Sequence, residues 1–176
     1  EGNIVKLFLN RLFKSRRGLA IMVCSPTVAG ESNIESLILK SDRRRPFVAC
    51  PCCGVEQILS WDNVDFKTSS GKVDPDIAAY VCTSCHQRWA ENERKRLLMT
   101  EGAVPWRQTR HFECCGERQD PMINQMWDGH FAVCKKCERH AVSNKDAGFE
   151  EASAIYSPEE ELPNMAREWL DCQGSR

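Results

Sequence analysis

Cysteine is the residue type with the greatest capacity for chemistry in this sequence, because the chain carries eleven of them. The most regular spacing is that of two C-x2-C pairs, Cys50 with Cys53 and Cys82 with Cys85. Two intervening residues allow both sulfurs of a pair to face one ion, and Gly54 allows the chain to fold back after the first pair with a positive φ. We therefore predict that the two pairs together bind one zinc ion.

A site made of four cysteines predicts a structural role, because a tetrahedral S4 zinc site leaves no coordination position for water or substrate. Cys52 lies inside the first pair and can replace a neighbouring ligand. A disulfide cluster would require an oxidising compartment, and the N-terminal sequence lacks the pattern of a secretion signal. A thiol redox site would place a single C-x2-C at the start of a helix rather than in matched pairs.

A second, less regular cluster follows. Cys134 and Cys137 form another C-x2-C pair, while the earlier side offers His111-x2-Cys114 or the adjacent pair Cys114-Cys115. We favour His111, Cys114, Cys134 and Cys137 as the ligands of a second zinc ion, with Cys115 as the alternative to His111. A small module buries little apolar surface, so metal binding would supply about 10 kcal/mol or more of its folding free energy.

Charge and hydropathy exclude some classes of protein. The formal net charge is −1, so the chain has no overall basic field for nucleic acid and only short basic runs, such as 14–17, 42–45 and 93–96. No run reaches the roughly 18 apolar residues that a membrane span needs. We expect a cytoplasmic protein without a membrane partner.

The elements that must position the cysteines are predicted from periodicity and capping. Residues 1–19 have helical spacing, 19–26 form a short apolar run typical of a buried strand, and a helix starts near Ser32 with Glu35 three residues later as a capping box. Short β-prone runs and turns surround the cysteines, and a basic helical segment, 90–102, separates the two clusters. We predict an α+β fold: the helix–strand–helix edge of an α/β domain, then two small zinc-ribbon-like β modules.

The chain closes with one more amphipathic segment. Its apolar residues share one helical face, and Pro163 suits the first turn of a helix because proline inside a helix costs about 3 kcal/mol. The stripe consists of Leu162, Met165, Ala166, Trp169 and Leu170. We predict a C-terminal helix here.

The order of these motifs resembles one family. The runs "CSPTVAGESNIESLILKSDRRRPFVACPCCGVEQILSWDNVDF", "AAYVCTSCHQRW" and "AGFEEASAIYSPEEELPNMAREWL" are similar, in that order, to the lambda-like (GpA-type) large subunit of phage terminase, the DNA-packaging motor and nuclease of tailed phages. The resemblance covers nearly the whole chain. The run from Cys114 to Glu138 is similar to a second cysteine module that some members carry.

The resemblance implies a division of the chain and a coupling motif. Its parts would be a C-terminal piece of a P-loop ATPase domain (1–45), a zinc ribbon (46–90), a linker helix (91–108), a second zinc-binding module (109–145), and a linker and helix leading toward a nuclease domain (146–176). By the same resemblance Ser25, Pro26 and Thr27 would couple nucleotide state to DNA movement, with Ser25 or Thr27 sensing the γ-phosphate.

The sequence departs from the family in the catalytic residues. The phosphate-loop pattern G-x4-G-K-[ST] does not occur, and neither the Walker B acidic residues nor the nuclease carboxylates are found. We expect a middle fragment, a truncated prophage gene or a piece of a disrupted reading frame, which by itself neither hydrolyses ATP nor cuts DNA. ATP and Mg would belong to the intact family protein.

The partners are also implied by the resemblance. They would be double-stranded DNA, the small terminase subunit and the portal, with the intact protein acting as an oligomer of a phage or prophage in a bacterial host. The alternative hypothesis is a stand-alone zinc-ribbon module that binds nucleic acid or another protein through Arg43–Arg45 and Arg94–Arg96.

Overall fold

The structure is a computed structural model that describes residues 4–12, 18–24, 32–141, 146–150 and 153–174. The chain divides into two compact units, Glu1–Leu39 and Lys40–Arg176. The larger unit carries both cysteine clusters.

The first unit contains helix α1 (Ile4–Leu12), and helix α2 (Asn33–Lys40) begins directly after Ser32, as the capping signal predicts. The strand expected at 19–26 is not formed over residues 18–24, where no helix or strand occurs. Leu19, Ile21 and Val23 are exposed there, Val23 by 91%. A buried strand needs neighbouring strands for its backbone hydrogen bonds, and the described residues of this unit supply none.

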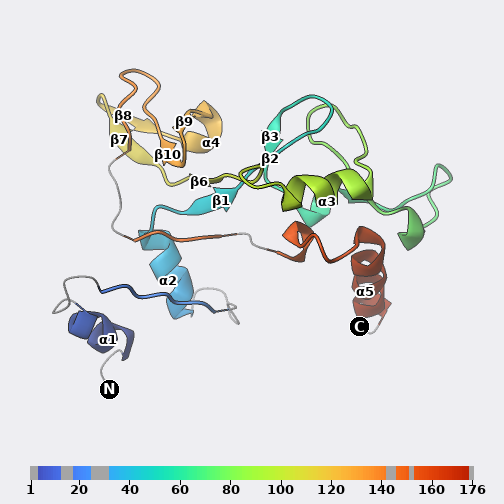
Figure 1. The fold of residues 1–176 in the computed structure, drawn as a ribbon, viewed down its shortest axis with the longest axis horizontal. Coiled ribbons are helices and arrows are strands. Elements are labelled where there is room, and N and C mark those ends of the chain that lie inside the picture. The colour runs from blue at the N-terminus through green and yellow to red at the C-terminus, as the bar shows by residue number, and fades with distance from the viewer. Residues whose placement is uncertain (1–3, 13–17, 25–31, 142–145, 151–152, 175–176) are drawn as a thin grey trace. The chain divides into compact units, whose positions relative to one another are not determined.

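The second unit is built from antiparallel strand pairs and short helices (Figure 1). The pairs are β1 (Arg44–Pro46) with β6 (Trp106–Gln108), β2 (Val48–Ala49) with β3 (Glu56–Gln57), β4 (Val64–Asp65) with β5 (Ala79–Tyr80), β7 (Phe112–Cys114) with β8 (Glu117–Gln119), and β9 (Trp127–Asp128) with β10 (Phe131–Ala132). The helices are α3 (Glu91–Met99), α4 (Pro121–Asn124) and α5 (Leu162–Gly174), with short 3-10 turns at Trp61–Asn63, Pro75–Ile77 and Ala154–Tyr156. The fold is α+β, as predicted.

Two strand pairs surround each cysteine cluster. We call residues 46–90, with β2–β3 and β4–β5, the first module, and residues 109–141, with β7–β8 and β9–β10, the second module. The β1–β6 pair lies next to both in sequence, since β1 leads into the first module and β6 into the second. The long-range pairing of β1 with β6 therefore brings the entrances of the two modules together.

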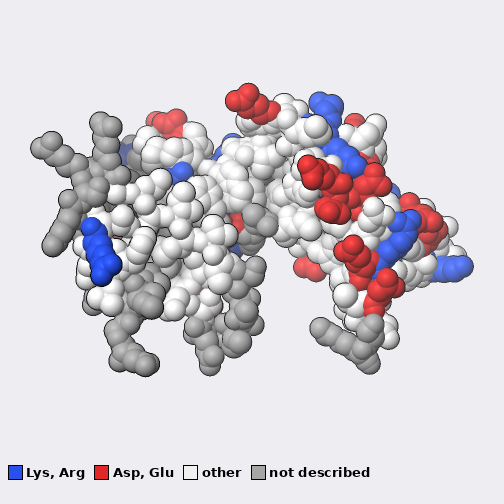
Figure 2. Space-filling model, turned by 60° about the horizontal axis from the view of Figure 1, so that its bottom comes forward, with Lys and Arg blue, Asp and Glu red and all other residues white. Residues whose placement is uncertain are grey.

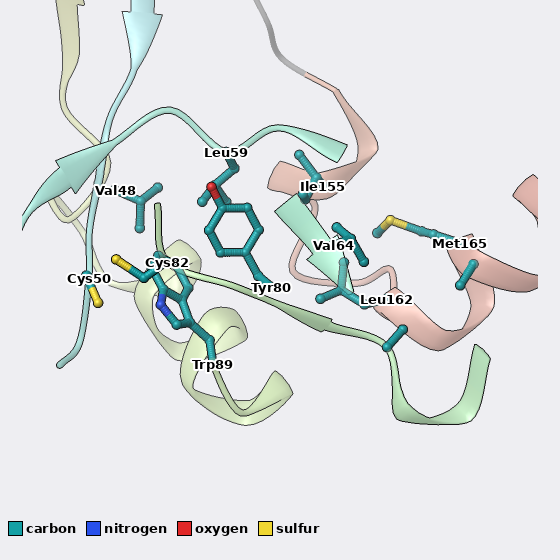
Figure 3. Close-up of a cluster of buried hydrophobic side chains, with 12 residues drawn as sticks. Val48, Cys50, Leu59, Val64, Tyr80, Cys82, Trp89, Ile155, Leu162 and Met165 are labelled. Atoms are coloured by element: carbon teal, nitrogen blue, oxygen red, sulfur yellow. The ribbon is translucent and has the colours of Figure 1, made fainter. Parts of the chain in front are cut away.

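The apolar core of this unit belongs to the first module and the C-terminal segment (Figure 3). Tyr80 and Trp89 lie at its centre with ring centroids 4.8 Å apart. The buried members are Val48, Cys50, Leu59, Val64, Ala78, Tyr80, Cys82, Trp89, Ile155, Leu162, Met165 and Ala166. The predicted stripe of α5 is therefore buried at Leu162, Met165 and Ala166, whereas Trp169 remains 40% exposed and contacts Phe66.

A buried arginine joins α3 to the segment that precedes α5. The Arg94 side chain is 0% exposed and forms an ion pair with Glu91. Its guanidinium also donates to the carbonyl oxygens of Ile155 (2.6 Å), Ser157 (3.2 Å) and Glu160 (2.5 Å). Five fixed donors on a planar group suit this role, since several carbonyls can be satisfied at once. Tyr156 adds a second link by donating to the carbonyl of Pro46 at 3.0 Å.

Candidate metal centres

Each cysteine group takes its sulfurs from two turns of the chain, which we call its corners. Three of these four corners are C-x2-C turns with the same backbone geometry. In each turn the amide two residues after the first cysteine donates to its sulfur at 3.4 Å: Cys52 to Cys50, Ser84 to Cys82, and Lys136 to Cys134. The residue after the second cysteine has a positive φ in every turn: Gly54 (72°), His86 (57°) and Glu138 (57°). Its amide also donates to the carbonyl of the first cysteine in each case. The spacing predicted from the sequence is therefore realised as one repeated turn.

The fourth corner is a tight β-hairpin rather than a C-x2-C turn. Cys114 is the last residue of β7 and pairs with Glu117 in β8. The two residues between them, Cys115 (φ 54°) and Gly116 (φ 74°), both have positive φ, which is the pattern of a type I′ turn. This turn lets two adjacent cysteines contribute sulfurs to the same group.

The sulfurs lie in two groups of four, within each of which all atoms are within 4.8 Å of one another. The groups are Cys50, Cys53, Cys82 and Cys85, and Cys114, Cys115, Cys134 and Cys137. Four sulfurs at about 2.3 Å from a tetrahedral ion would lie about 3.8 Å apart. The sulfur separations of Cys50–Cys85 and Cys53–Cys82 are each 3.8 Å, and that of Cys114–Cys115 is 3.9 Å. Both groups can hold a metal ion.

In the first group the pKa of one thiol, Cys82, is lowered and that of another, Cys85, is raised. Burial acts to raise the pKa of Cys82, but hydrogen bonds from the amides of Cys85 and Ser84 and from Gln57 and Cys50 outweigh burial and lower the pKa to about 6. For Cys85 a backbone hydrogen bond from Gln87 is outweighed by burial and the neighbouring sulfurs, which raise the pKa to about 12. A divalent cation would remove this difference, because it binds all four sulfurs as thiolates.

The second group also contains one cysteine with a lowered pKa and one with a raised pKa. A backbone hydrogen bond from Arg139 and the sulfurs of Cys115 and Cys114 lower the pKa of Cys137 to about 6. The sulfurs of Cys137 and Cys134, together with burial, raise the pKa of Cys114 to about 12. The lowered pKa falls on the first cysteine of the later C-x2-C pair in the first group and on the second cysteine of that pair in the second group, so the two groups share their geometry but not their charge pattern.

His111, predicted as a ligand of the second group, lies outside it. Its Nε2 is 2.8 Å from an Asp120 carboxylate oxygen, and its Nδ1 is 2.8 Å from the Arg118 guanidinium. The reason is strand geometry: β7 begins directly after His111, and residues three apart in an extended chain point to opposite faces. The four-sulfur group contains Cys115 and not His111.

The sequence of this chain was compared with known protein families, curated proteins and solved structures. The family profile of the ATPase domain of the phage terminase large subunit gpA matches residues 1–106, which is more than half of the 176-residue chain. This chain belongs to the gpA family of phage terminase large subunits. No curated protein and no solved structure matches it. The resemblance stated from the motifs is confirmed, and the match contains the whole first module.

The gpA-family coupling motif expected at Ser25, Pro26 and Thr27 lies outside the described residues, so its role remains a prediction. The terminase chain was also expected to lack a membrane segment. Among the described residues, no helix combines the length and apolar character needed to cross a bilayer.

Four of the arginines proposed for nucleic-acid binding in the alternative hypothesis, Arg43, Arg44, Arg45 and Arg94, form ion pairs within this terminase chain, whereas Arg96 is exposed. Arg94 is fully buried, as described above. Arg43 donates to both carboxylate oxygens of Glu150, at 2.5 and 2.9 Å, and Arg44 donates to Asp42 at 2.8 Å. On the face seen in Figure 2, basic side chains lie next to acidic ones. These contacts weaken the hypothesis of a stand-alone nucleic-acid-binding module.

Two buried glutamines next to the metal groups were not predicted as site residues. Gln57 is 6% exposed and Gln119 is 1% exposed. The signal that identifies them is a repeated string, "CCGVEQ" at 52–57 and "CCGERQ" at 114–119, with a glutamine four residues after Cys53 and after Cys115.

Proposed function

We propose that this chain supplies the zinc-ribbon region of a phage terminase large subunit, held together by two zinc ions, and that it has no catalytic activity of its own. The observation that carries the proposal is the pair of four-sulfur groups. Each offers four cysteines at separations suited to a tetrahedral ion, and four sulfur ligands leave no position for a reacting water. Cysteine-only sites favour zinc over harder ions such as Mg²⁺.

The contacts between the two modules indicate how the proposed zinc-ribbon region is held together. The β1–β6 pair and the bidentate contact of Arg107 with Glu56 connect the strand that precedes the second module to the first module. Trp127 of the second module packs on Phe47 with ring centroids 5.1 Å apart. These contacts support one unit made of both modules, rather than two independent zinc domains.

The lack of catalysis is supported by the sequence, which contains no phosphate-loop lysine in a G-x4-G-K-[ST] pattern. ATP, Mg and nuclease metals would be bound by other parts of an intact terminase. Within such an assembly the partners would be double-stranded DNA, the small terminase subunit and the portal, in the cytoplasm of a bacterial host.

Elemental analysis of the purified chain tests the metal sites. We expect two zinc ions per chain, one in Cys50→Ser/Cys53→Ser and one in Cys134→Ser/Cys137→Ser. Cys52→Ser is the matched control, because Cys52 lies outside the four-sulfur group, and it should retain both ions. A wild-type chain without zinc would refute the proposal.

Phosphate release from ATP tests the catalytic part. The zinc-loaded chain should show no turnover above buffer. Turnover that survives chelation of the zinc would show a nucleotide site that the sequence does not predict.

A further inference from the structure

The two modules share one backbone plan around their cysteines. Gln57 pairs with Val48 and Gln119 pairs with Phe112, each at the far end of the hairpin that carries the first cysteines. Closer to the turn, the Cys50 amide donates to the Val55 carbonyl, and Cys114 pairs with Glu117. Val55 and Glu117 each lie two residues before the glutamine. The second hairpin is therefore the first one with two turn residues removed.

The second halves of the modules correspond equally closely. The bridge Val81↔Arg88 spans the Cys82 turn, and the bridge Val133↔His140 spans the Cys134 turn. The amide of Cys82 donates to the carbonyl five residues later, and the amide of Cys134 does the same. Gln57 is therefore placed relative to the Cys50 and Cys82 turns as Gln119 is placed relative to the Cys114 and Cys134 turns.

In the first module the side-chain amide of Gln57 connects these two corners. Its Oε1 accepts from the backbone amide and the hydroxyl of Thr83, the residue after Cys82, both at 3.0 Å. Its Nε2 donates to the sulfur of Cys82 at 3.4 Å. One neutral group therefore holds the second corner by its backbone and by its sulfur.

In the second module Gln119 makes the contact to the backbone amide but not the contact to the sulfur. Its Oε1 accepts from the amide of Lys135, the residue after Cys134, at 3.4 Å, and from Asn124 Nδ2 at 3.0 Å. Its Nε2 is buried and has no hydrogen-bond partner among the described residues. A buried donor without an acceptor costs about 1–3 kcal/mol, so a native structure retains one only for a reason.

We propose that Gln57 and Gln119 are equivalent positioning residues of two copies of one metal-binding module, each donating its side-chain N–H to a metal-bound sulfur, that of Cys82 and that of Cys134. The inference rests on the proposed function, because the sulfur accepts strongly only as a thiolate. For Gln119 the N–H···S contact forms when the ion draws the four sulfurs into their final positions.

The chemistry explains why the residue is a glutamine. An amide presents an acceptor to the backbone N–H and a donor to the sulfur while adding no charge, whereas a carboxylate would repel the thiolates. The donated hydrogen bond withdraws charge from the sulfur and fixes its direction. Groups of this kind outside the ligand set typically change metal affinity about 10- to 100-fold when they are removed.

Cobalt-substituted protein and the kinetics of zinc release test the proposal. Gln119→Met keeps the length of the side chain but removes the N–H, and Gln57→Met does the same in the first module. We expect each variant to bind two cobalt ions, to shift the sulfur-to-cobalt charge-transfer band of its own site to longer wavelength, and to release zinc from that site about 10- to 100-fold faster. The other site should be unchanged.

Asn124→Ala is the matched control for the second module, because it removes a bond to Gln119 Oε1 and leaves Nε2 in place. It should leave the charge-transfer band unmoved. Should Gln119→Met fail to fold, Gln57→Met still decides the question, since the aromatic core supports the first module. Two bound ions with unshifted bands in the methionine variants would overturn the inference alone, whereas a wild-type chain that binds no metal would overturn the proposed function as well.

Discussion

The first and second modules have the same backbone plan around their cysteines but differ in what surrounds the metal group. The positions of Tyr80 and Trp89 in the first module correspond to Ala132 and Ala141 in the second, since the Trp89 amide donates to the Tyr80 carbonyl and the Ala141 amide to the Ala132 carbonyl, both at 2.8 Å. The large aromatic pair fills the centre of a core that extends to α5. The alanines build no such core, and no residue of the second module belongs to that cluster.

This difference shows two ways of stabilising the same small fold. In the first module the metal would add to buried apolar surface, because Cys50 and Cys82 are themselves core residues. In the second module the metal would stand in for the core, supplying about 10 kcal/mol or more. The four predictions below test this contrast, from the largest expected effect to the smallest.

Removal of metal should affect the modules unequally. On treatment with a strong chelator we expect residues 109–141 to lose all protection from amide hydrogen exchange, because little apolar surface remains to hold them. Residues 48–89 and 155–166 should keep partial protection through their shared core. Hydrogen exchange followed by mass spectrometry measures both regions in one experiment, and equal loss in both would contradict the contrast.

Truncation of an aromatic core residue should damage the first module. Trp89→Ala should lower the free energy of unfolding by about 3–5 kcal/mol, as large-to-small changes of buried aromatic residues do. Urea unfolding of the zinc-loaded protein gives this value. Ile123→Ala in the second module is the control: Ile123 is 78% exposed, and the change should stay within about 0.5 kcal/mol.

Replacement of the buried arginine should loosen the C-terminal segment from the first module. Arg94→Met leaves three carbonyl oxygens and Glu91 without their partner, so we expect a loss of about 3 kcal/mol in the free energy of unfolding. Exchange protection at 155–166 should fall with it. Arg96→Met, at an exposed position of the same helix, should cause no comparable change; a similar loss in both variants would mean that general charge, not the buried contacts, matters.

The smallest effect should be the same in both modules. His86 and Glu138 hold positive φ after their cysteine pairs, where L residues are strained by about 1–2 kcal/mol. Substitution by glycine relieves this strain, but the greater conformational freedom of glycine in the unfolded chain offsets part of the relief. We therefore expect His86→Gly and Glu138→Gly each to raise the free energy of unfolding by about 0.5 kcal/mol. Thermal unfolding of the zinc-loaded variants checks this. Gly54→Ala should act in the opposite direction, and a stabilising effect of that alanine would contradict the argument.

Much of the local structure is predictable because it depends on near neighbours in sequence. The helix expected at 90–102 is found as α3, and the C-terminal stripe is found as α5 with its apolar face buried. The apolar run at 19–26 was misleading for the opposite reason. Its β character depends on pairing with other strands, and residues 18–24 have no strand partner among the described residues.

The basic run at 93–96 was a second place where local character misleads. A charge run usually indicates a solvated face, and Arg96 is indeed exposed. Arg94 is buried because the carbonyls of residues 155–160 converge on it, more than 60 residues later in the chain. Nothing near Arg94 in the sequence indicates which of the charged residues will receive those contacts.

The sequence by itself determined the C-x2-C turns and the family, because a two-residue spacing restricts the backbone to one turn and the order of motifs needs no coordinates. Only the tertiary structure shows that Cys115, and not His111, lies within 4.8 Å of the other three sulfurs. That arrangement depends on where β7 begins and on a two-residue hairpin with positive φ at both positions. The physical reason is that strand register, set by pairing across the hairpin, decides which side chains share a face.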